Sequence, residues 1–327
     1  MATSAQTLKK PDSLDLNAGK SRSLWADAMR RLLRNRAAVL GIVIVLAYIL
    51  IALAAPLIAK KNPVEQPARN SLRPPVWVTD NPRRVPNPEN IFGTDNNGRD
   101  IFSRLIYGTR VSLIVGLVPQ LIIISLGVTI GLVAGFNGGW IDNLLMRFTE
   151  IVAAFPDFLF IITLTVAFRD TFFGKAFSGL LLIFTALAII SWTGMARLVR
   201  GQVLSLKEKE FVEAARALGI PTWKILAQHI LPNTLAPIIV SISFSIPGLI
   251  IAEAILTFLG VGMRPSVNPD NPLPTSLGLM MYDGFANLSS GPWMLLFPVT
   301  MIAVLVIAFT FVGDGLRDAL DPRDQGR

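Results

Sequence analysis

The sequence predicts an all-α polytopic membrane protein with six transmembrane helices. Of its 327 residues, 52% are apolar and only 16% are charged, whereas soluble domains carry roughly a quarter charged residues. The deficit is concentrated in six windows with few or no charges, and Lys and Arg lie mostly between these windows. This pattern excludes a soluble enzyme, a disordered chain and a fibrous protein.

The six windows predict the transmembrane spans in chain order. Each is long enough to cross ~30 Å of hydrocarbon at about 1.5 Å per residue. The third is the least regular, because Arg147, Glu150 and Asp157 lie inside it. The first is interpreted as an anchor and not as a cleaved signal peptide, since 36 residues precede a long apolar run. The predicted spans are residues 37–58, 111–136, 143–168, 176–196, 233–259 and 293–313.

Basic residues predict the orientation of the spans. Arg30, Arg31, Arg34 and Arg36 lie directly before the first span, and such clusters mark the cytoplasmic side of a membrane. Because six spans return the chain to the side where it started, we expect both termini in the cytoplasm. The net charge of +8 is therefore interpreted as cytoplasmic loops that contact anionic lipid, and not as a nucleic-acid surface.

The spans divide the chain into five parts. We expect a cytoplasmic N-terminal segment (1–36), the first transmembrane helix (37–58), an extracytoplasmic loop with a surface helix (59–110), a five-helix core (111–313) and a cytoplasmic tail (314–327). An inside loop, 197–232, interrupts the core between its third and fourth helices.

The extracytoplasmic part 59–110 has two predicted halves. Its first half is rich in proline and cannot form a regular helix. Its second half contains an apolar helical stripe made of Ile101, Phe102, Leu105 and Ile106. We expect this stripe to lie along the membrane surface before the second span begins.

Three glycines in the second span form a packing face. Gly127, Gly131 and Gly135 recur every four residues, so they lie on one side of a helix where another backbone can come close. The partner is either another helix of this chain or a helix of a second subunit.

The inside loop carries the most specific pattern in the sequence. At about 100° per residue, Phe211, Ala214, Ala215 and Leu218 fall on one face of a helix. A stripe centred on small residues suits a helix inserted into a groove of a partner protein. An ordinary surface helix on lipid would show the same periodicity, so that alternative stays open.

The residues around this stripe predict where the helix ends. Glu213 and Arg216 point away from the apolar face. Gly219 can take a positive φ and so ends the helix, and Pro221 suits the first turn of a second helix. The loop is therefore predicted as two short helices joined by a glycine turn, with Pro232 leading into the fifth span.

The sequence offers few groups for catalysis or metal binding. It has no Cys, and its only histidine, His229, cannot build a metal site alone. No phosphate-binding glycine loop is present, because Leu14 stands where the first Gly would precede Gly19-Lys20-Ser21. We expect no catalytic residue, no metal and no cofactor in this chain. Energy for any transport would come from a partner or from an ion gradient.

Two intramembrane carboxylates are candidates for the translocation path. Asp157 follows Pro156 in the third span, and Glu253 lies near the outer end of the fifth. Ionisable residues inside a membrane are costly and point to function. Each has a structural alternative, because Asp157 could satisfy backbone donors at the proline kink and Glu253 could reach water or a paired group.

The inside loop resembles the EAA loop of bacterial ABC-importer permeases. The matching residues are Glu213, Ala214, Ala215, Gly219, Leu231 and Pro232. His229 departs from the pattern, since an Ile usually stands there. The peptide and nickel branch is matched at residues 92–95, 98–100, 102–104, 107–108, 154–156, 196–200, 253–254, 258–260 and 314–318. The similarity covers about residues 25–323, and the long loop after the first span resembles the C-type member of the permease pair.

The resemblance implies a type I ABC-importer permease fold in the bacterial cytoplasmic (inner) membrane. It implies a second permease subunit of the B-type, two ATPase domains that bind ATP and Mg, an extracytoplasmic substrate-binding protein and surrounding lipid as partners. The residues that would couple the chain to the ATPase are Phe211, Glu213, Ala214, Ala215, Leu218 and Gly219. The substrate stays open among dipeptides, oligopeptides, nickel chelates, glutathione and oligosaccharides.

Two other classes of function compete with this interpretation. An ion-coupled secondary transporter would work alone, and it predicts an internal repeat with charged midplane residues in matching helices. A membrane assembly factor without transport activity would not require a groove-fitting helix in the loop 197–232. The sequence shows no such repeat, and the loop is unexplained by either class.

Overall fold

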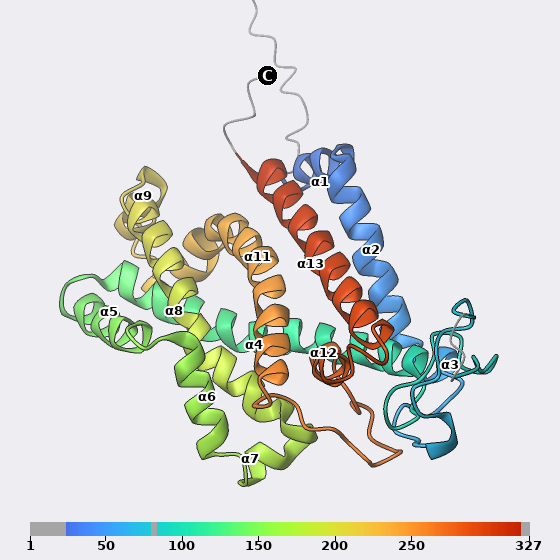
Figure 1. Ribbon diagram of the computed structural model, residues 1–327. Coiled ribbons are helices and arrows are strands. Elements are labelled where there is room, and N and C mark those ends of the chain that lie inside the picture. The colour runs from blue at the N-terminus through green and yellow to red at the C-terminus, as the bar shows by residue number, and fades with distance from the viewer. Residues whose placement is uncertain (1–23, 80–83, 322–327) are drawn as a thin grey trace, which may run out of the picture.

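Every regular element in the described part of the protein is a helix (Figure 1). The structure, a computed structural model, describes residues 24–79 and 84–321, so most of the predicted N-terminal segment and the end of the predicted tail lie outside it. The principal helices are α1 (Leu24–Arg34), α2 (Arg36–Leu53), α3 (Ala55–Ile58), α4 (Ile101–Asn137), α5 (Gly139–Ala153), α6 (Asp157–Ala167), α7 (Phe172–Lys175), α8 (Leu180–Leu206), α9 (Glu210–Ala217), α10 (Thr222–Ile225), α11 (Leu231–Phe258), α12 (Leu277–Ala286) and α13 (Trp293–Leu320).

The helices supply the predicted spans, and one of these spans is bent. Within the described residues, 5 helices are long and apolar enough to cross a membrane. A sixth span results if α5 and α6 are counted together as one span. The axes of α5 and α6 differ by 79°. Pro156 stands at the break, and proline cannot continue a helix because it lacks an N–H group. The predicted third span is therefore two helices joined at a sharp corner.

Helix α4 differs from the prediction for residues 101–110. The structure has one continuous helix from Ile101 to Asn137, so no separate surface helix precedes the second span. Asp100 caps the helix by accepting a hydrogen bond from the Ser103 amide. Ile101 and Leu105 are buried against Leu277 of α12 and the start of α13. Their apolar stripe is covered by this chain and does not rest on lipid.

The predicted glycine stripe is where α4 packs against α8. A Cβ atom on Gly127 would lie 2.6 Å from Cβ of Met195, and one on Gly131 would lie 2.6 Å from the carbonyl oxygen of Ala196. Gly135 faces α8 in the same way. Any larger side chain would push the two helices apart. The sequence left open whether the partner is a helix of this chain or of a second subunit, and in the structure it is α8 of this chain.

The helices place three distant segments at one end of the molecule (Figure 1). Helix α1 packs on the C-terminal part of α13 through Leu32 and Ala319, and α9 lies toward the same end in Figure 1. Helix α7 and the segment that follows α3 lie toward the opposite end. We call these the α9 end and the α7 end.

A buried ion cluster holds the segment before α4 to α12. Asp95 accepts a hydrogen bond of 2.6 Å from Nε of Arg99 and a second bond from Arg104. Both guanidinium groups also reach the same oxygen of Asp283, each at 2.8 Å. Arg104 is 1% exposed. Two positive and two negative charges therefore balance inside the protein, as a buried cluster requires.

Candidate functional site

The loop between α8 and α11 folds as two short helices, as its sequence predicts. Helix α9 ends at Ala217, and Gly219 follows with φ +70°. No heavy atom beyond its neighbours lies within 4 Å of a Cβ built there, so backbone conformation and not space favours glycine at this position. Helix α10 begins after Pro221, and a π-helical turn at Leu226–Ile230 joins it to α11.

The face of α9 that packs into the protein differs from the predicted partner-facing stripe. Val212 and Ala215 are 0% and 2% exposed and belong to the main hydrophobic core together with Ile225 of α10. Ala215 was predicted at the centre of the face that meets a partner, and this position is wrong. The periodicity fixes one apolar arc on α9, but it cannot tell which part of that arc the chain itself covers.

Large apolar side chains remain exposed elsewhere on this loop. Phe211 is 41% exposed, Leu218 is 80% exposed and Trp223 of α10 is 64% exposed. Ala214 and Glu213 are exposed between them in sequence. We call Phe211, Leu218 and Trp223 the loop apolar residues. Exposed apolar groups on a polar loop are typical of a protein–protein contact.

Two contacts fix α9 and its supporting helices at this end of the molecule. The guanidinium of Arg216 lies over the ring of Phe136 in α4, 4.9 Å from the ring centre. Arg200 of α8 donates two hydrogen bonds to Asp142 of α5, at 2.6 and 2.7 Å. A paired guanidinium and carboxylate in this fork geometry is rigid as well as strong. The Arg216–Phe136 contact therefore connects α9 to α4, and the Arg200–Asp142 pair connects α8 to α5.

Asp157 lines a central cavity between α4, α6, α8 and α11. The cavity has a volume of about 390 Å³. Its polar lining residues are Gln120, Asp157, Ser191, Ser241 and Ser245. Apart from Asp157, sequence reasoning missed this set. The available signal was the spacing of Ser241 and Ser245, four residues apart and so on one face of an otherwise apolar span.

Glu253, the other sequence candidate for the translocation path, does not line this cavity. The residue is 0% exposed. Its Oε1 accepts a hydrogen bond of 2.8 Å from the Thr257 hydroxyl, which in turn accepts one of 3.1 Å from the amide of Met263. The carboxyl group thus helps to fix the turn after α11. Glu253 therefore has a paired group, as in the structural alternative that the sequence left open, because the chain folds back over this end of the helix.

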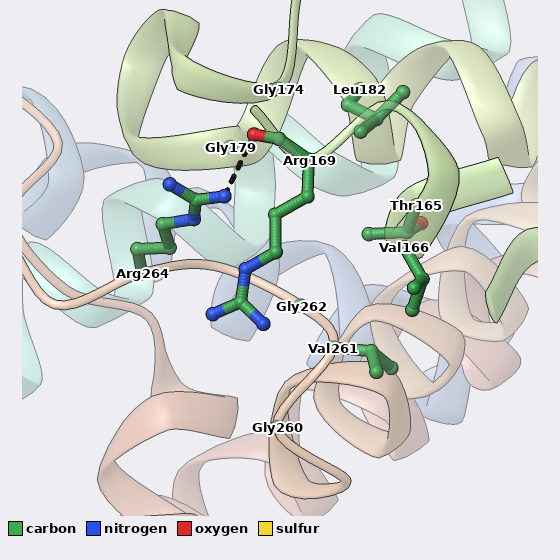
Figure 2. A pocket seen from close by; sticks show the side chains of 10 residues that line it. All are labelled: Thr165, Val166, Arg169, Gly174, Gly179, Leu182, Gly260, Val261, Gly262 and Arg264. Atoms are coloured by element: carbon green, nitrogen blue, oxygen red, sulfur yellow. Dashed lines mark hydrogen bonds between the residues drawn. The ribbon is translucent and has the colours of Figure 1, made fainter. Parts of the chain in front are cut away.

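A second, smaller pocket lies toward α7, between α6, α8 and the segment that follows α11 (Figure 2). Thr165 of α6 and Leu182 of α8 line it, about one turn beyond cavity residues Ile161 and Leu187. Figure 2 shows the Arg169 side chain pointing into the middle of the pocket beside Arg264. Arg264 donates a hydrogen bond of 2.7 Å to the carbonyl oxygen of Arg169. The pocket presents guanidinium groups, whereas the central cavity presents a carboxylate.

Comparison with known protein families gives two matches. Residues 127–324 match the family described as "Binding-protein-dependent transport system inner membrane component". Residues 23–75 match the "N-terminal TM domain of oligopeptide transport permease C". The matched segments together include α1, α2 and every helix from α5 to α13.

Individual relatives agree with these matches. The chain is 39% identical over 306 residues to the oligopeptide transport system permease protein OppC of Haemophilus influenzae, covering 94% of this chain and 91% of that protein. The OppC protein of Escherichia coli is also 39% identical, with 94% and 93% covered. The dipeptide transport system permease protein DppC of Alkalihalophilus pseudofirmus is 39% identical, with 92% and 90% covered.

The fold is also found in a solved structure. The inward-facing MetNI methionine ABC transporter contains a chain that superimposes with a TM-score of 0.54 at 16% identity. The match covers 66% of this chain and 96% of that chain. At this identity the likeness concerns the fold, which is that of an ABC-transporter membrane subunit.

Proposed function

The chain belongs to the family of inner-membrane components of binding-protein-dependent transport systems, and from this premise we propose that it moves peptides across the cytoplasmic membrane as one of two permease subunits. Its relatives carry the names of oligopeptide and dipeptide permeases. The second permease subunit would be a B-type paralogue, and an extracytoplasmic protein would deliver the peptide. In this proposal, ATP and Mg are bound by two partner ATPase domains and not by this chain.

One observation carries the proposal, namely the apolar side chains exposed on the loop between α8 and α11. Phe211 and Leu218 are exposed while Ala215 fills the core, so α9 is anchored through Ala215 and uncovered at Phe211 and Leu218. An ATPase groove would cover these uncovered residues, together with Ala214 and Glu213. Closure of the ATPase pair would then push α9, and the contact of Arg216 with Phe136 would transmit the movement to α4.

The proposal assigns the α9 end of the molecule to the cytoplasm. Arg30, Arg31 and Arg34 lie in α1 at this end, and basic clusters favour the cytoplasmic side. Both termini, the N-terminal segment 1–36, the coupling loop 197–232 and the tail would be cytoplasmic. The segment 59–100 and α7 would face the outside.

Cysteine labelling tests this orientation, because the chain has no native cysteine. Val85 is 68% exposed before α4 and Met29 is 55% exposed on α1. In intact cells, a membrane-impermeant maleimide should label Val85→Cys but not Met29→Cys until the membrane is opened. Labelling of Met29→Cys from outside, at the rate seen for Val85→Cys, would place the termini on the other side.

Purification and uptake together test the proposed function. The full chain, tagged and purified from its host in mild detergent, should bring with it an ATPase and a second six-span protein. In vesicles, this complex and its binding protein should accumulate a labelled peptide only when ATP is on the ATPase side. Uptake by the chain alone, driven by an ion gradient, would instead support the secondary transporter.

A further inference from the structure

The central cavity contains polar groups that packing of the helices does not require. Its walls come from α4, α6, α8 and α11, which otherwise meet through Ile, Leu and Met side chains. Asp157 is exposed to this space, and no ion pair or hydrogen bond from residues 24–79 or 84–321 satisfies its side chain. A carboxylate cannot face hydrocarbon without large cost. The wall that carries Asp157 therefore borders water, a partner subunit or a solute.

Gln120 lines the same cavity and joins two of its walls, but its amide nitrogen is buried and not presented to the open space. The side chain is 3% exposed, and its Oε1 accepts a bond of 2.7 Å from the Ser245 hydroxyl. Its Nε2 has no partner in the described part of the protein. A buried amide nitrogen without a partner costs about 1–3 kcal/mol. The bond to Ser245 joins α4 to α11, but that contact uses only half of the carboxamide.

Small residues keep the cavity open along α8 and α11. Ser241, Ser245 and Gly248 follow at spacings of four and three residues, which places them on one face of α11. Nothing lies within 4 Å of a Cβ built on Gly248, and the same holds for Gly194 on α8. Larger side chains at these positions would fill the space. The helices thus line a cavity with hydroxyl groups and bare backbone.

The lining chemistry fits one class of solute. A volume of about 390 Å³ lies within the range of roughly 300–1,000 Å³ typical of small-molecule sites. The lining includes one carboxylate and no Lys or Arg. An ammonium group is therefore attracted to Asp157. A peptide carries such a group at its amino terminus.

We propose that this cavity is a peptide subsite within the translocation path, where Asp157 binds the α-ammonium group of the peptide. The inference rests on the proposed function, and it adds a recognition step inside the membrane that is separate from capture by the binding protein. The subsite recognises a group that peptides share, so it accepts many side chains. Solutes without a free amino terminus bind it more weakly.

Uptake kinetics test the Asp157 side chain. Asp157→Asn, in the complete complex with its binding protein, should lower the maximal rate of trialanine uptake by roughly tenfold, as expected for one lost hydrogen bond to a charged group. Asp157→Glu should retain most of the rate. Asp170→Asn is the matched control, since Asp170 is 89% exposed and lies outside the cavity. Equal co-purification of the ATPase would show that each variant assembles.

Cysteine protection tests binding without the binding protein. A Ser241→Cys variant of the purified complex should react with a methanethiosulfonate reagent, and millimolar trialanine should slow the reaction several-fold. N-acetyl-trialanine, which lacks the ammonium group, should protect far less. In the Asp157→Asn background, the two peptides should protect equally.

The outcomes separate the subsite from the proposed function. If the unaltered complex takes up trialanine while Asp157→Asn transports at its rate, and acetylation does not change protection, the subsite does not exist and the permease assignment stands. If the assembled, unaltered complex takes up no peptide with ATP, the proposed function itself fails. Slowed uptake with loss of the preference for a free amino terminus supports the subsite.

Discussion

An Arg104→Leu variant is expected to lose about 3–5 kcal/mol of unfolding free energy, because it breaks a buried ion cluster. Arg104 is 1% exposed and binds both Asp95 and Asp283. Without it, Arg99 alone faces two buried or half-buried carboxylates. Thermal unfolding of the purified chain in detergent should show a lower apparent Tm, together with less protein recovered from the membrane.

A control and a rescue make this result specific. Arg69→Leu also removes an arginine from the segment before α4, but Arg69 is exposed, so its effect should stay within about 0.5 kcal/mol. The double variant Arg104→Leu, Asp283→Leu leaves the neutral pair Arg99–Asp95. It should lose less stability than the sum of the two single variants. A Tm for Arg104→Leu equal to that of Arg69→Leu would show that the cluster does not hold this segment.

An Ala215→Asp variant is expected to destabilise the coupling loop itself, by about 3–5 kcal/mol. Ala215 is 2% exposed and packs in the core with Val212 and Ile225. Aspartate at this position buries a carboxylate without a partner and adds volume to a packed region. Less protein and a lower apparent Tm should result, even for the chain purified without ATPase subunits.

The neighbouring residue supplies the matched control for this variant. Ala214 is exposed on the same helix, so Ala214→Asp should change the stability of the chain by no more than about 0.5 kcal/mol. Its charge would meet the ATPase, so co-purification of the ATPase and substrate-stimulated ATP hydrolysis should fall. Equal losses of stability in the two variants would contradict the orientation of α9.

Composition and periodicity were sufficient to predict the spans and the glycine stripe. A run without charges has one solution in lipid, since only a helix satisfies its own backbone groups there. The bend at Pro156 and the continuity of α4 needed the structure. The stripe at Ile101 and Leu105 is as compatible with lipid as with α12, and only the tertiary fold shows that Leu277 covers it.

The candidate site was predictable in its location and less so in its orientation. The glycine turn at Gly219 follows from local backbone preference, and its φ of +70° agrees with that expectation. The inward face of α9 depends on the core that receives Ala215, which no local pattern encodes. Likewise, Asp157 and Glu253 are similar in sequence context, but one borders a cavity and the other binds Thr257.

Cross-linking at Leu218 tests most directly whether α9 couples this chain to an ATPase. Leu218 is 80% exposed and Ala215 is 2% exposed, and the absence of native cysteine permits single-cysteine variants of both. In an active complex, Leu218→Cys should cross-link to a cysteine in the groove of the ATPase subunit, with a yield that changes when ATP binds, whereas Ala215→Cys should not. A transport-active complex in which Leu218→Cys never cross-links, with or without ATP, would contradict the account.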